Sequence, residues 1–223
     1  MRQPRRTLCP LALLGLSIVG IWLAPPTIVS ADEPWRMLFD GSTLDGWVRR
    51  GGEATYTIEE GAIVGHSRKG TPNTFLCTDR NYGDFELELE FMVHPELNSG
   101  IQIRSNSLPD YKNGQVHGYQ VEIDPSERAW TAGIYDEGRR GWLADLKENE
   151  AARQAFRPNE WNKVRIVCDG SSIRTWLNDV PAADLTDDLT AEGFIALQVH
   201  STDRDEPMTI RWRNIRLREL KDE

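Results

Sequence analysis

Several chemical signatures are missing from this 223-residue chain. It has three cysteines, with no Cys-x-x-Cys pair and no cluster of His and Cys at zinc spacing, so no motif of a structural zinc site is present. No Gly-x-Ser-x-Gly sequence occurs, which removes the usual signature of Ser/His/Asp nucleophilic catalysis. An EF-hand-like calcium loop is also missing. Internal repeats, low-complexity tracts and a second domain are not evident either.

Long apolar runs are lacking after the N-terminus. The one such run, residues 8–23, follows three arginines within the first six residues, and Val29-Ser30-Ala31 then offers a small-residue cleavage site. This order is typical of a secretory signal peptide, and the run is slightly short for the alternative, an uncleaved membrane anchor. We therefore predict a signal peptide over residues 1–31, export to the periplasm or the medium, and one domain over residues 32–223 with no membrane part.

Positive charge is also scarce. Without its first 31 residues the chain has 23 Lys and Arg against 35 Asp and Glu, a net charge of −12, which argues against a nucleic-acid partner. A neutral carbohydrate stays compatible, because its recognition depends on hydrogen bonds and aromatic platforms. Cys77 and Cys168 alternate with apolar neighbours, as buried free thiols do, so we predict no disulfide between them although export would permit one.

Polar and apolar residues alternate over much of the chain. Residues 85–93 are a clear case, and hairpins are predicted around Glu59-Glu60-Gly61, Asp169-Gly170 and Asn178-Asp179. In the last strand, residues 210–217, the apolar phase slips across Asn214, which predicts a bulge. Helical periodicity is confined to residues 143–156 and is weak. Roughly a dozen short strands predict an all-β fold, an antiparallel β-sandwich or jelly roll.

Three of the predicted strands carry polar residues on one face: residues 100–104 (GIQIR), 118–124 (GYQVEID) and 194–200 (FIALQVH). Side chains alternate across a strand, so residues two apart share a face. Planar hydrogen-bonding groups of this kind bind hydroxyls and move protons, so the shared face could form a sugar site. Alternation alone leaves open three ordinary solvated strand faces. The polar face would carry Gln102, Arg104, Gln120, Glu122, Asp124, Gln198 and His200.

Two residues of this set suggest catalytic chemistry. His200 is the candidate for proton transfer, because an unperturbed imidazole titrates near neutral pH, and the alternative is a hydrogen-bonded strand residue. Arg104 is a fixed cation that could stabilise an oxyanion or enolate, or else form an ion pair with Glu122 or Asp124 on the neighbouring strand. His117, just before a strand, is expected at the rim of the site. No cofactor or metal site is indicated, although Glu122 with Asp124 could hold a divalent cation.

The segment from Glu122 to Glu127 (EIDPSE) also fits the E-x-D-x-x-E pattern of laminarinase-type glycoside hydrolases. Retaining chemistry needs two carboxyl groups about 5–5.5 Å apart. In a regular strand Glu122 and Asp124 share a face and Glu127 points away, and Pro125 cannot donate a ladder hydrogen bond. We therefore predict that the strand ends there and that Glu127 is a loop residue.

An ordered set of short segments resembles the 3-keto-disaccharide hydrolase domain family, whose members are exported bacterial proteins with a concanavalin A-like jelly-roll fold. The segments run over nearly all of the chain after residue 31 and stand in the family's order. They are LFDGSTLDGW (38–47), EGAIVG (60–65), YGDFELELEF (82–91), NSGIQIR (98–104), YQVEID (119–124), AGIY (132–135), NEWNKVRIVC (159–168), GFIALQVH (193–200) and RNIRLREL (213–220).

The resemblance implies cleavage of 3-keto-glycosides or 3-keto-disaccharides. A ketone at carbon 3 acidifies the proton on carbon 2, so a base can form an enolate that expels the group on carbon 1, and water then adds. His200, Arg104 and Glu122 would serve as base, enolate stabiliser and acid, with base and acid exchangeable.

Residues 136–140 (DEGRR) depart from the family pattern, because they are more charged than we expect at this place.

The alternative function is a carbohydrate-binding, lectin-like module without catalysis. The residues expected to bind the sugar are Gln102, Gln120, Asp124, Tyr135, Gln198 and His117.

Overall fold

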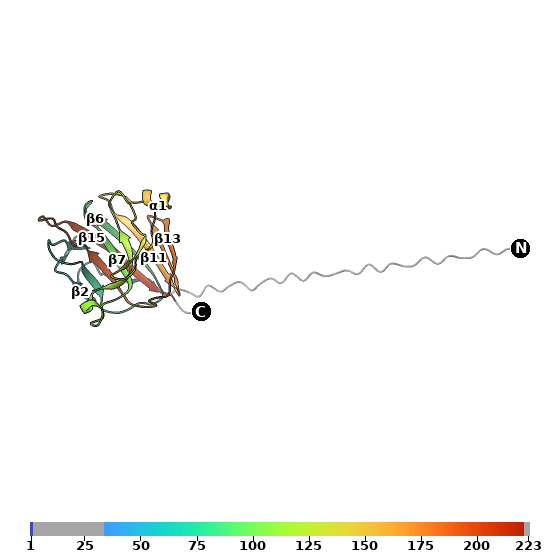
Figure 1. The fold of residues 1–223 in the computed structure, drawn as a ribbon, viewed down its shortest axis with the longest axis horizontal. Helices are drawn as coiled ribbons and strands as arrows, with labels where there is room; N and C mark the ends of the chain where they lie inside the picture. Colours follow the sequence, from blue (N-terminus) through green and yellow to red (C-terminus); the bar gives the residue numbers. More distant parts are fainter. Residues whose placement is uncertain (2–33, 221–223) are drawn as a thin grey trace. The chain divides into compact units, whose positions relative to one another are not determined.

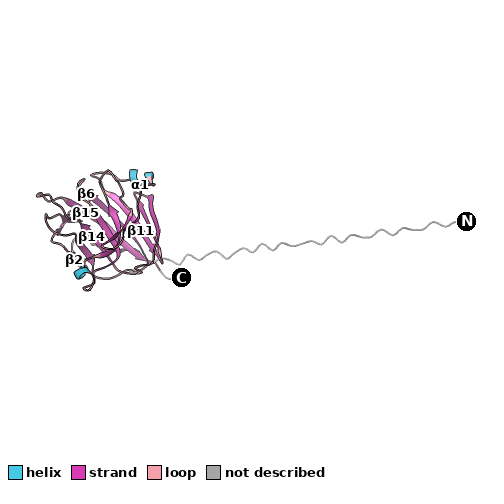
Figure 2. Cartoon of the chain, in the orientation of Figure 1, coloured by secondary structure: helices cyan, strands magenta, loops and turns pink. Residues whose placement is uncertain are grey.

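Two antiparallel sheets pack on one shared core in the computed structural model, which describes Met1 and residues 34–220. The predicted signal peptide otherwise lies outside the described residues. Strands dominate the described part, with two short helical segments (Figure 2). The predicted all-β sandwich is confirmed. Among the described residues, no helix is long and apolar enough to cross a membrane.

Sheet A has seven strands in one path, and β1 (Arg36–Met37) pairs separately with its fifth strand, β15. The order is β13 (Val180–Thr186), β12 (Ser172–Leu177), β11 (Asn162–Asp169), β6 (Phe85–Val93), β15 (Thr209–Glu219), β4 (Ala62–His66) and β3 (Thr55–Glu59). The one α-helix, α1 (Glu150–Gln154), lies beside β13 at the sheet's end (Figure 1).

Sheet B has seven strands and places three predicted strands side by side. Its order is β10 (Gly141–Ala144), β9 (Ile134–Glu137), β8 (His117–Ile123), β7 (Ser99–Asn106), β14 (Phe194–Val199), β5 (Thr74–Thr78) and β2 (Trp47–Gly51). The segments that the sequence singled out are β8, β7 and β14, which are direct neighbours. A 3-10 turn, η1 (Lys112–Gly114), lies in the connection between β7 and β8.

The core confirms the predicted alternation. Ile101, Tyr119, Val121 and Leu197 of sheet B turn inward and are fully buried together with apolar residues of sheet A such as Leu87. Burying one such side chain stabilises the fold by about 1.5–3 kcal/mol. The same alternation turns the neighbouring residues of β7, β8 and β14 to the outer face of sheet B, the face away from the core.

Turn residues explain how the hairpins close. Asn178 and Asp179 both have left-handed backbone angles (φ 49° and 67°), which a two-residue hairpin turn requires and which Asn and Asp tolerate. Asn214 (φ 53°) lies at a register shift of β15 between Arg213 and Arg216, so the predicted bulge is confirmed. The weak helix predicted over residues 143–156 is mostly wrong, because only Glu150–Gln154 is helical and residues 141–144 form β10.

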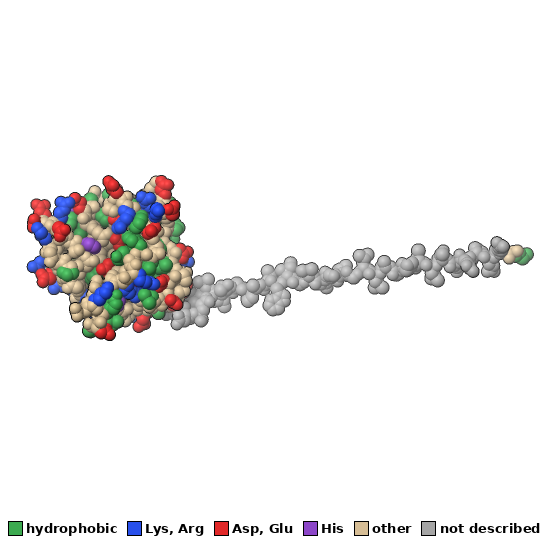
Figure 3. Space-filling model, viewed as in Figure 1, with side chains coloured by type: hydrophobic (Ala, Val, Ile, Leu, Met, Phe, Trp, Pro, Cys, Tyr) green, Lys and Arg blue, Asp and Glu red, His purple; other side chains and the backbone are tan. Residues whose placement is uncertain are grey.

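Charged side chains cover the outer face of sheet A. Glu86 and Glu88 on β6 are buried, because Arg and Lys side chains of β11 and β15 pair with them from both sides. Acidic and basic side chains are interspersed over the face seen in Figure 3.

The two cysteines of the described residues are free and buried, and they lie in different sheets, Cys77 on β5 and Cys168 on β11. The predicted absence of a disulfide is confirmed. Burial raises the pKa of each thiol to about 12.

Candidate functional site

A polar pocket of about 370 Å³ lies on the outer face of sheet B. Strand register explains part of its wall, because Gln120 of β8 stands opposite Tyr135 of β9, and residues directly opposite each other share a face. Glu122 and Glu137, each two residues further along its own strand, belong to the same face. The pocket is lined by Asn73, Asn98, Gln120, Glu122, Arg128, Tyr135, Glu137, Trp142 and His200.

A row of buried amides orients Glu122. Gln102 and Gln198 each donate from Nε2 to Oε1 of Gln120, at 2.5 and 2.9 Å. Gln120 in turn donates from Nε2 to Oε2 of Glu122 at 2.8 Å. The predicted shared face is therefore correct for these four residues. Gln102 and Gln198 are fully buried and lie outside the pocket lining, so they position Gln120 rather than touch a ligand.

A glycine makes room for this row. Gly100 of β7 stands opposite Glu122, and a Cβ atom at this position would lie 2.4 Å from the side chain of Gln120. Any larger residue would therefore displace Gln120 from Glu122.

Glu122 is a buried carboxyl group with a second donor. Asn98 donates from Nδ2 to Oε1 at 2.6 Å. Burial raises the pKa of Glu122, and the charge of Asp124 adds to this, while hydrogen bonds from Asn98 and Gln120 and the charge of Arg128 oppose it. A carboxyl group of this kind can hold a proton at higher pH than an exposed one, as a general acid must.

Glu137 is a second carboxyl group in the pocket, and the sequence analysis missed it. Burial raises its pKa, and the charges of Glu122 and Asp136 add to this, whereas a hydrogen bond from Asn73 and the charge of His200 lower it. A usable signal was present, because Glu137 lies two residues after Tyr135 on the same strand. The register between β8 and β9, which sets Glu137 opposite Gly118, is not readable from the sequence.

His200 follows β14 directly and lines the pocket as a partly exposed side chain. Its Nδ1 lies 2.8 Å from the carbonyl oxygen of Ser201. A carbonyl can only accept, so Nδ1 carries a proton and the neutral ring keeps its lone pair on Nε2. Asn73 links this segment to the second carboxyl group, since it accepts from the amide of Ser201 at 2.9 Å and donates to Glu137 at 3.4 Å.

Arg128 supplies a cation that the sequence analysis did not identify. Its Nε donates to Oδ2 of Asp124 at 2.7 Å, and its Nη2 lies 3.9 Å from Oε1 of Glu122. The guanidinium also lies over the rings of Trp130 and Trp142, at 4.9 and 5.0 Å.

Asp124 was expected on the binding face, but it lies outside the pocket lining. Its two oxygens accept from Ser126, Arg128 and the amide of Trp130. It therefore holds the loop that presents Arg128 instead of contacting a ligand.

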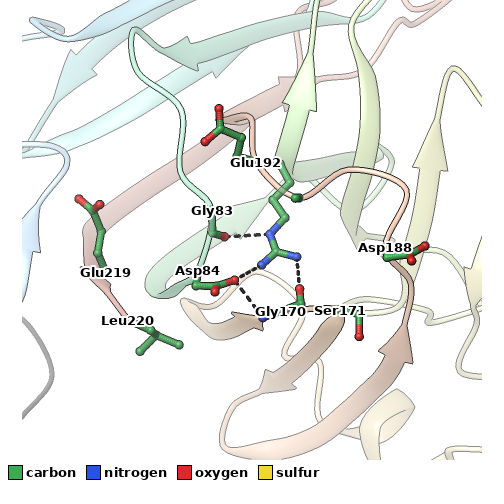
Figure 4. A pocket seen from close by; sticks show the side chains of 10 residues that line it. Gly83, Asp84, Gly170, Ser171, Asp188, Glu192, Glu219 and Leu220 are labelled. Carbon is green, nitrogen blue, oxygen red and sulfur yellow. Dashed lines mark hydrogen bonds and ion pairs between the residues drawn. The ribbon is translucent and has the colours of Figure 1, made fainter. Parts of the chain in front are cut away.

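The predicted position of Arg104 is wrong. Its backbone is left-handed (φ 44°), and the register of β7 with β8 shifts between Ile103 and Asn106, so its side chain leaves the alternation. The guanidinium is buried and donates to the carbonyl oxygens of Gly83 and Gly170, at 2.8 and 2.7 Å, and to Asp84 at 2.5 Å (Figure 4).

These partners of Arg104 belong to sheet A and its turns. Arg104 lines a separate cavity of about 420 Å³ together with them. It therefore joins the two sheets and does not face the pocket that holds Glu122 and His200.

Of the remaining candidate residues, some line the pocket and others do not. Tyr135 lines the pocket as expected. His117 is buried outside that lining, with its ring 3.9 Å from that of Tyr111 and its Nδ1 2.8 Å from the carbonyl oxygen of Gln115. Glu127 lies exposed in a turn after β8, as predicted. Within residues 34–220, no group of three or more His, Cys, Asp or Glu side chains is arranged to hold a metal ion.

Comparison with known proteins identifies a family. The profile of the 3-keto-alpha-glucoside-1,2-lyase-like domain matches residues 34–218. A search of curated proteins finds no matching relative.

Solved structures share the fold at low sequence identity. A proposed glycosyl hydrolase from Parabacteroides distasonis matches with a TM-score of 0.60 and 18% identity, over 84% of this chain and 94% of its own. A carbohydrate-binding module from Bacillus subtilis gives 0.56 and 19%, over 76% and 93%. A β-glucanase from Bacillus licheniformis gives 0.54 and 11%, over 86% and 100%. The expected concanavalin-like architecture is confirmed by these neighbours.

Proposed function

Since the chain belongs to the family of 3-keto-alpha-glucoside-1,2-lyase-like domains, we propose that it is an exported enzyme that cleaves glycosides already oxidised to a ketone at sugar carbon 3. The oxidised ring binds in the pocket of sheet B. The observation that carries the proposal is the grouping there of one histidine, two carboxyl groups whose pKa burial raises, and one arginine.

Each of these groups has a step to perform. His200 removes the proton from carbon 2 through Nε2, and the electrons of the broken C–H bond form the enolate of the ketone. Arg128, in place of Arg104, stabilises the negative charge on the enolate oxygen. The enolate then restores the ketone, a double bond forms between carbons 1 and 2, and the bond from carbon 1 to the leaving oxygen breaks.

The leaving oxygen takes a proton from a carboxylic acid of the pocket. Glu122, the sequence-based choice, and Glu137 both suit this role because burial favours their protonated forms. Water then adds its hydroxyl group to carbon 1 and a proton to carbon 2, so that the net reaction is hydrolysis.

A carbohydrate-binding module without catalysis is the second candidate. Tyr135 and Trp142 line the pocket with rings 5.4 Å apart, and aromatic walls of this kind bind sugars. The structural similarity to a carbohydrate-binding module is in keeping with this function.

The test compares leaving-group release from a 3-keto-glycoside with release from its 3-hydroxy parent, using the chain from Asp32 onward. We expect release from the ketone alone, and loss of roughly 10²–10⁴-fold in rate for His200→Gln with the fold retained. Binding of both compounds with cleavage of neither would favour the binding module. Equal cleavage of both would exclude elimination and indicate direct displacement.

A further inference from the structure

The hydroxyl group of Tyr135 is uncommitted in the pocket of sheet B. Other polar side chains of the lining are already engaged with each other, and Gln120 and Asn98, for example, both donate to Glu122. Within the described residues, no side chain or backbone group forms a hydrogen bond with the Tyr135 hydroxyl. A phenol in this state can donate to a ligand without giving up a bond to the protein.

Strand register and ring packing hold Tyr135 in place. Tyr135 of β9 stands opposite Gln120 of β8 on one side and opposite Trp142 of β10 on the other, so the three side chains form one row on the outer face of the sheet. The Tyr135 ring meets the Trp142 indole edge to face, with centroids 5.4 Å apart, and Trp142 meets Trp130 in the same way at 4.8 Å. The hydroxyl group is therefore positioned before a ligand binds.

Arg128, the cation assigned to the enolate, packs against the same indole. Its guanidinium lies 5.0 Å from the centroid of Trp142, and its Nη2 lies 3.9 Å from Oε1 of Glu122. Burial raises the pKa of the Tyr135 phenol, and the charges of Glu137 and Glu122 add to this. The phenol therefore keeps its proton at neutral pH, and the pocket brings a neutral donor and a cation close to Glu122.

Arg128 alone is a weak partner for an enolate. Its Nε donates to the buried carboxylate of Asp124, which balances part of its charge. Glu122 and Glu137 line the same pocket, and each of them repels a new negative charge whenever it is ionised. Stabilising the enolate therefore calls for a second donor, and a hydrogen bond to an ionised oxygen is roughly twice as strong as one to a neutral oxygen. The phenol supplies such a donor without adding charge.

We propose that Tyr135 is a catalytic residue whose hydroxyl group donates a hydrogen bond to the ketone oxygen on carbon 3. The inference rests on the proposed function. When His200 removes the proton of carbon 2, the electrons of the C–H bond form a double bond between carbons 2 and 3, and the π electrons of the carbonyl group move to its oxygen. The phenol keeps its own proton throughout, and its bond to this oxygen strengthens as the negative charge develops. Arg128 supports the same oxygen, so the two residues form an oxyanion hole.

The first experiment compares Tyr135→Phe with the wild type on the methyl and the nitrophenyl glycosides of one 3-keto sugar. Removal of one oxyanion donor should lower kcat roughly 10²–10³-fold on both, because the donor acts before the bond to the leaving oxygen breaks. KM should change little, because the aromatic ring is kept. Tyr82→Phe is the matched control: the Tyr82 hydroxyl pairs with Arg36 and lies outside the pocket lining, so kcat should stay as in the wild type.

Three kinetic results would overturn the role of Tyr135. One is a wild-type kcat in Tyr135→Phe, and another is a rise in KM alone, which would make the residue a binding group. The third is a fall confined to the methyl glycoside, which would make Tyr135 the acid for the leaving oxygen. In urea unfolding, Tyr135→Phe should match the wild type, because its hydroxyl has no partner in the described part of the chain, and a clear loss of stability would instead indicate a structural hydroxyl.

The second experiment observes the enolate without cleavage. The 1,5-anhydro form of the 3-keto sugar has hydrogen in place of the leaving group, so it cannot undergo elimination, but its carbon 2 can still exchange hydrogen for deuterium in D₂O. Proton NMR should show that the wild type and Tyr82→Phe accelerate this exchange, and that the catalysed rate is roughly 10²–10³-fold lower with Tyr135→Phe. Equal exchange with Tyr135→Phe and the wild type would overturn the proposal.

These measurements separate the two claims. If the wild type cleaves the ketone and Tyr135→Phe matches it in both experiments, the role of Tyr135 fails and the proposed function stands. If the wild type neither cleaves the ketone nor exchanges the hydrogen on carbon 2, the proposed function fails and the role of Tyr135 fails with it.

Discussion

Arg104 provides a sharp test of the structure, because its sequence pattern predicts a catalytic cation and its surroundings indicate a structural clamp. We consider the substitution Arg104→Met, which keeps much of the side chain's volume and removes its three hydrogen bonds. The side chain is 1% exposed, and both carbonyl oxygens that it satisfies belong to residues next to sheet A strands. Loss of the guanidinium therefore leaves three acceptors at the junction of the two sheets without this donor.

The expected cost follows from these contacts. Removing one partner of a buried ion pair costs about 3–5 kcal/mol. The side chain of Asp84 is 26% exposed, so water can partly replace the lost cation and the estimate belongs near the lower end, at about 3 kcal/mol. For a domain of this size each kcal/mol lowers the melting temperature by about 2–4 °C, so Arg104→Met should melt roughly 6–12 °C below the wild type.

The measurement is urea unfolding together with release from a 3-keto-glycoside at a temperature well below melting. Arg68→Met is the matched control, because Arg68 and its partner Glu53 are both mostly exposed, and such a pair contributes less than about 1 kcal/mol. An unfolding free energy of Arg104→Met within about 1 kcal/mol of the wild type would refute the clamp. Loss of more than about 100-fold in activity at unchanged stability would restore the catalytic role.

Three further predictions follow from the site and the core. Burial raises the pKa of Glu122 above its ordinary value of 4.5, so the folded state keeps this proton to a higher pH than the unfolded state. The wild type should therefore lose stability relative to Glu122→Gln as pH rises through and above 4.5. A stability difference that does not depend on pH in urea unfolding would contradict this. Arg128→Met should lower kcat/KM on the ketone roughly 10²–10³-fold, and full activity would exclude enolate stabilisation by this residue. The variant should also lose stability, because the buried carboxylate of Asp124 loses its guanidinium partner, so activity is compared well below the melting temperature of the variant. Because Cys77 and Cys168 are buried, they should resist a thiol reagent at neutral pH in the native chain from Asp32 onward, and both should react in denaturant. The absence of reactive thiols in the denatured chain would indicate a disulfide.

The strands of this fold could be predicted because alternation and turn chemistry are local. Residues 85–93 became β6, and Asn178-Asp179 closed a hairpin by the left-handed angles that these residue types tolerate. The same local rule failed at Arg104. A bulge in β7 reverses the alternation there, and no neighbouring glycine or proline in the sequence marks it.

The amide row was predictable for the same reason, since Gln120 and Glu122 lie two apart on one strand. The rest of the pocket depends on information that the sequence does not display. Glu137 reaches the site through the register of β9 against β8. Arg128 lies in a loop that the side chain of Asp124 holds through hydrogen bonds, and Asn73 lies directly before β5. Which loops meet over a sheet is set by tertiary packing, so residue type alone could not identify these three.

The most direct test of the central claim is the origin of the hydrogen on carbon 2 of the product. Elimination removes this hydrogen and hydration replaces it from water. A reaction run in D₂O should therefore give a free keto sugar that carries deuterium at carbon 2, beyond the amount in recovered substrate and in a reaction with His200→Gln. Mass spectrometry and proton NMR measure this content. A product that keeps its original hydrogen at carbon 2 would contradict the elimination mechanism.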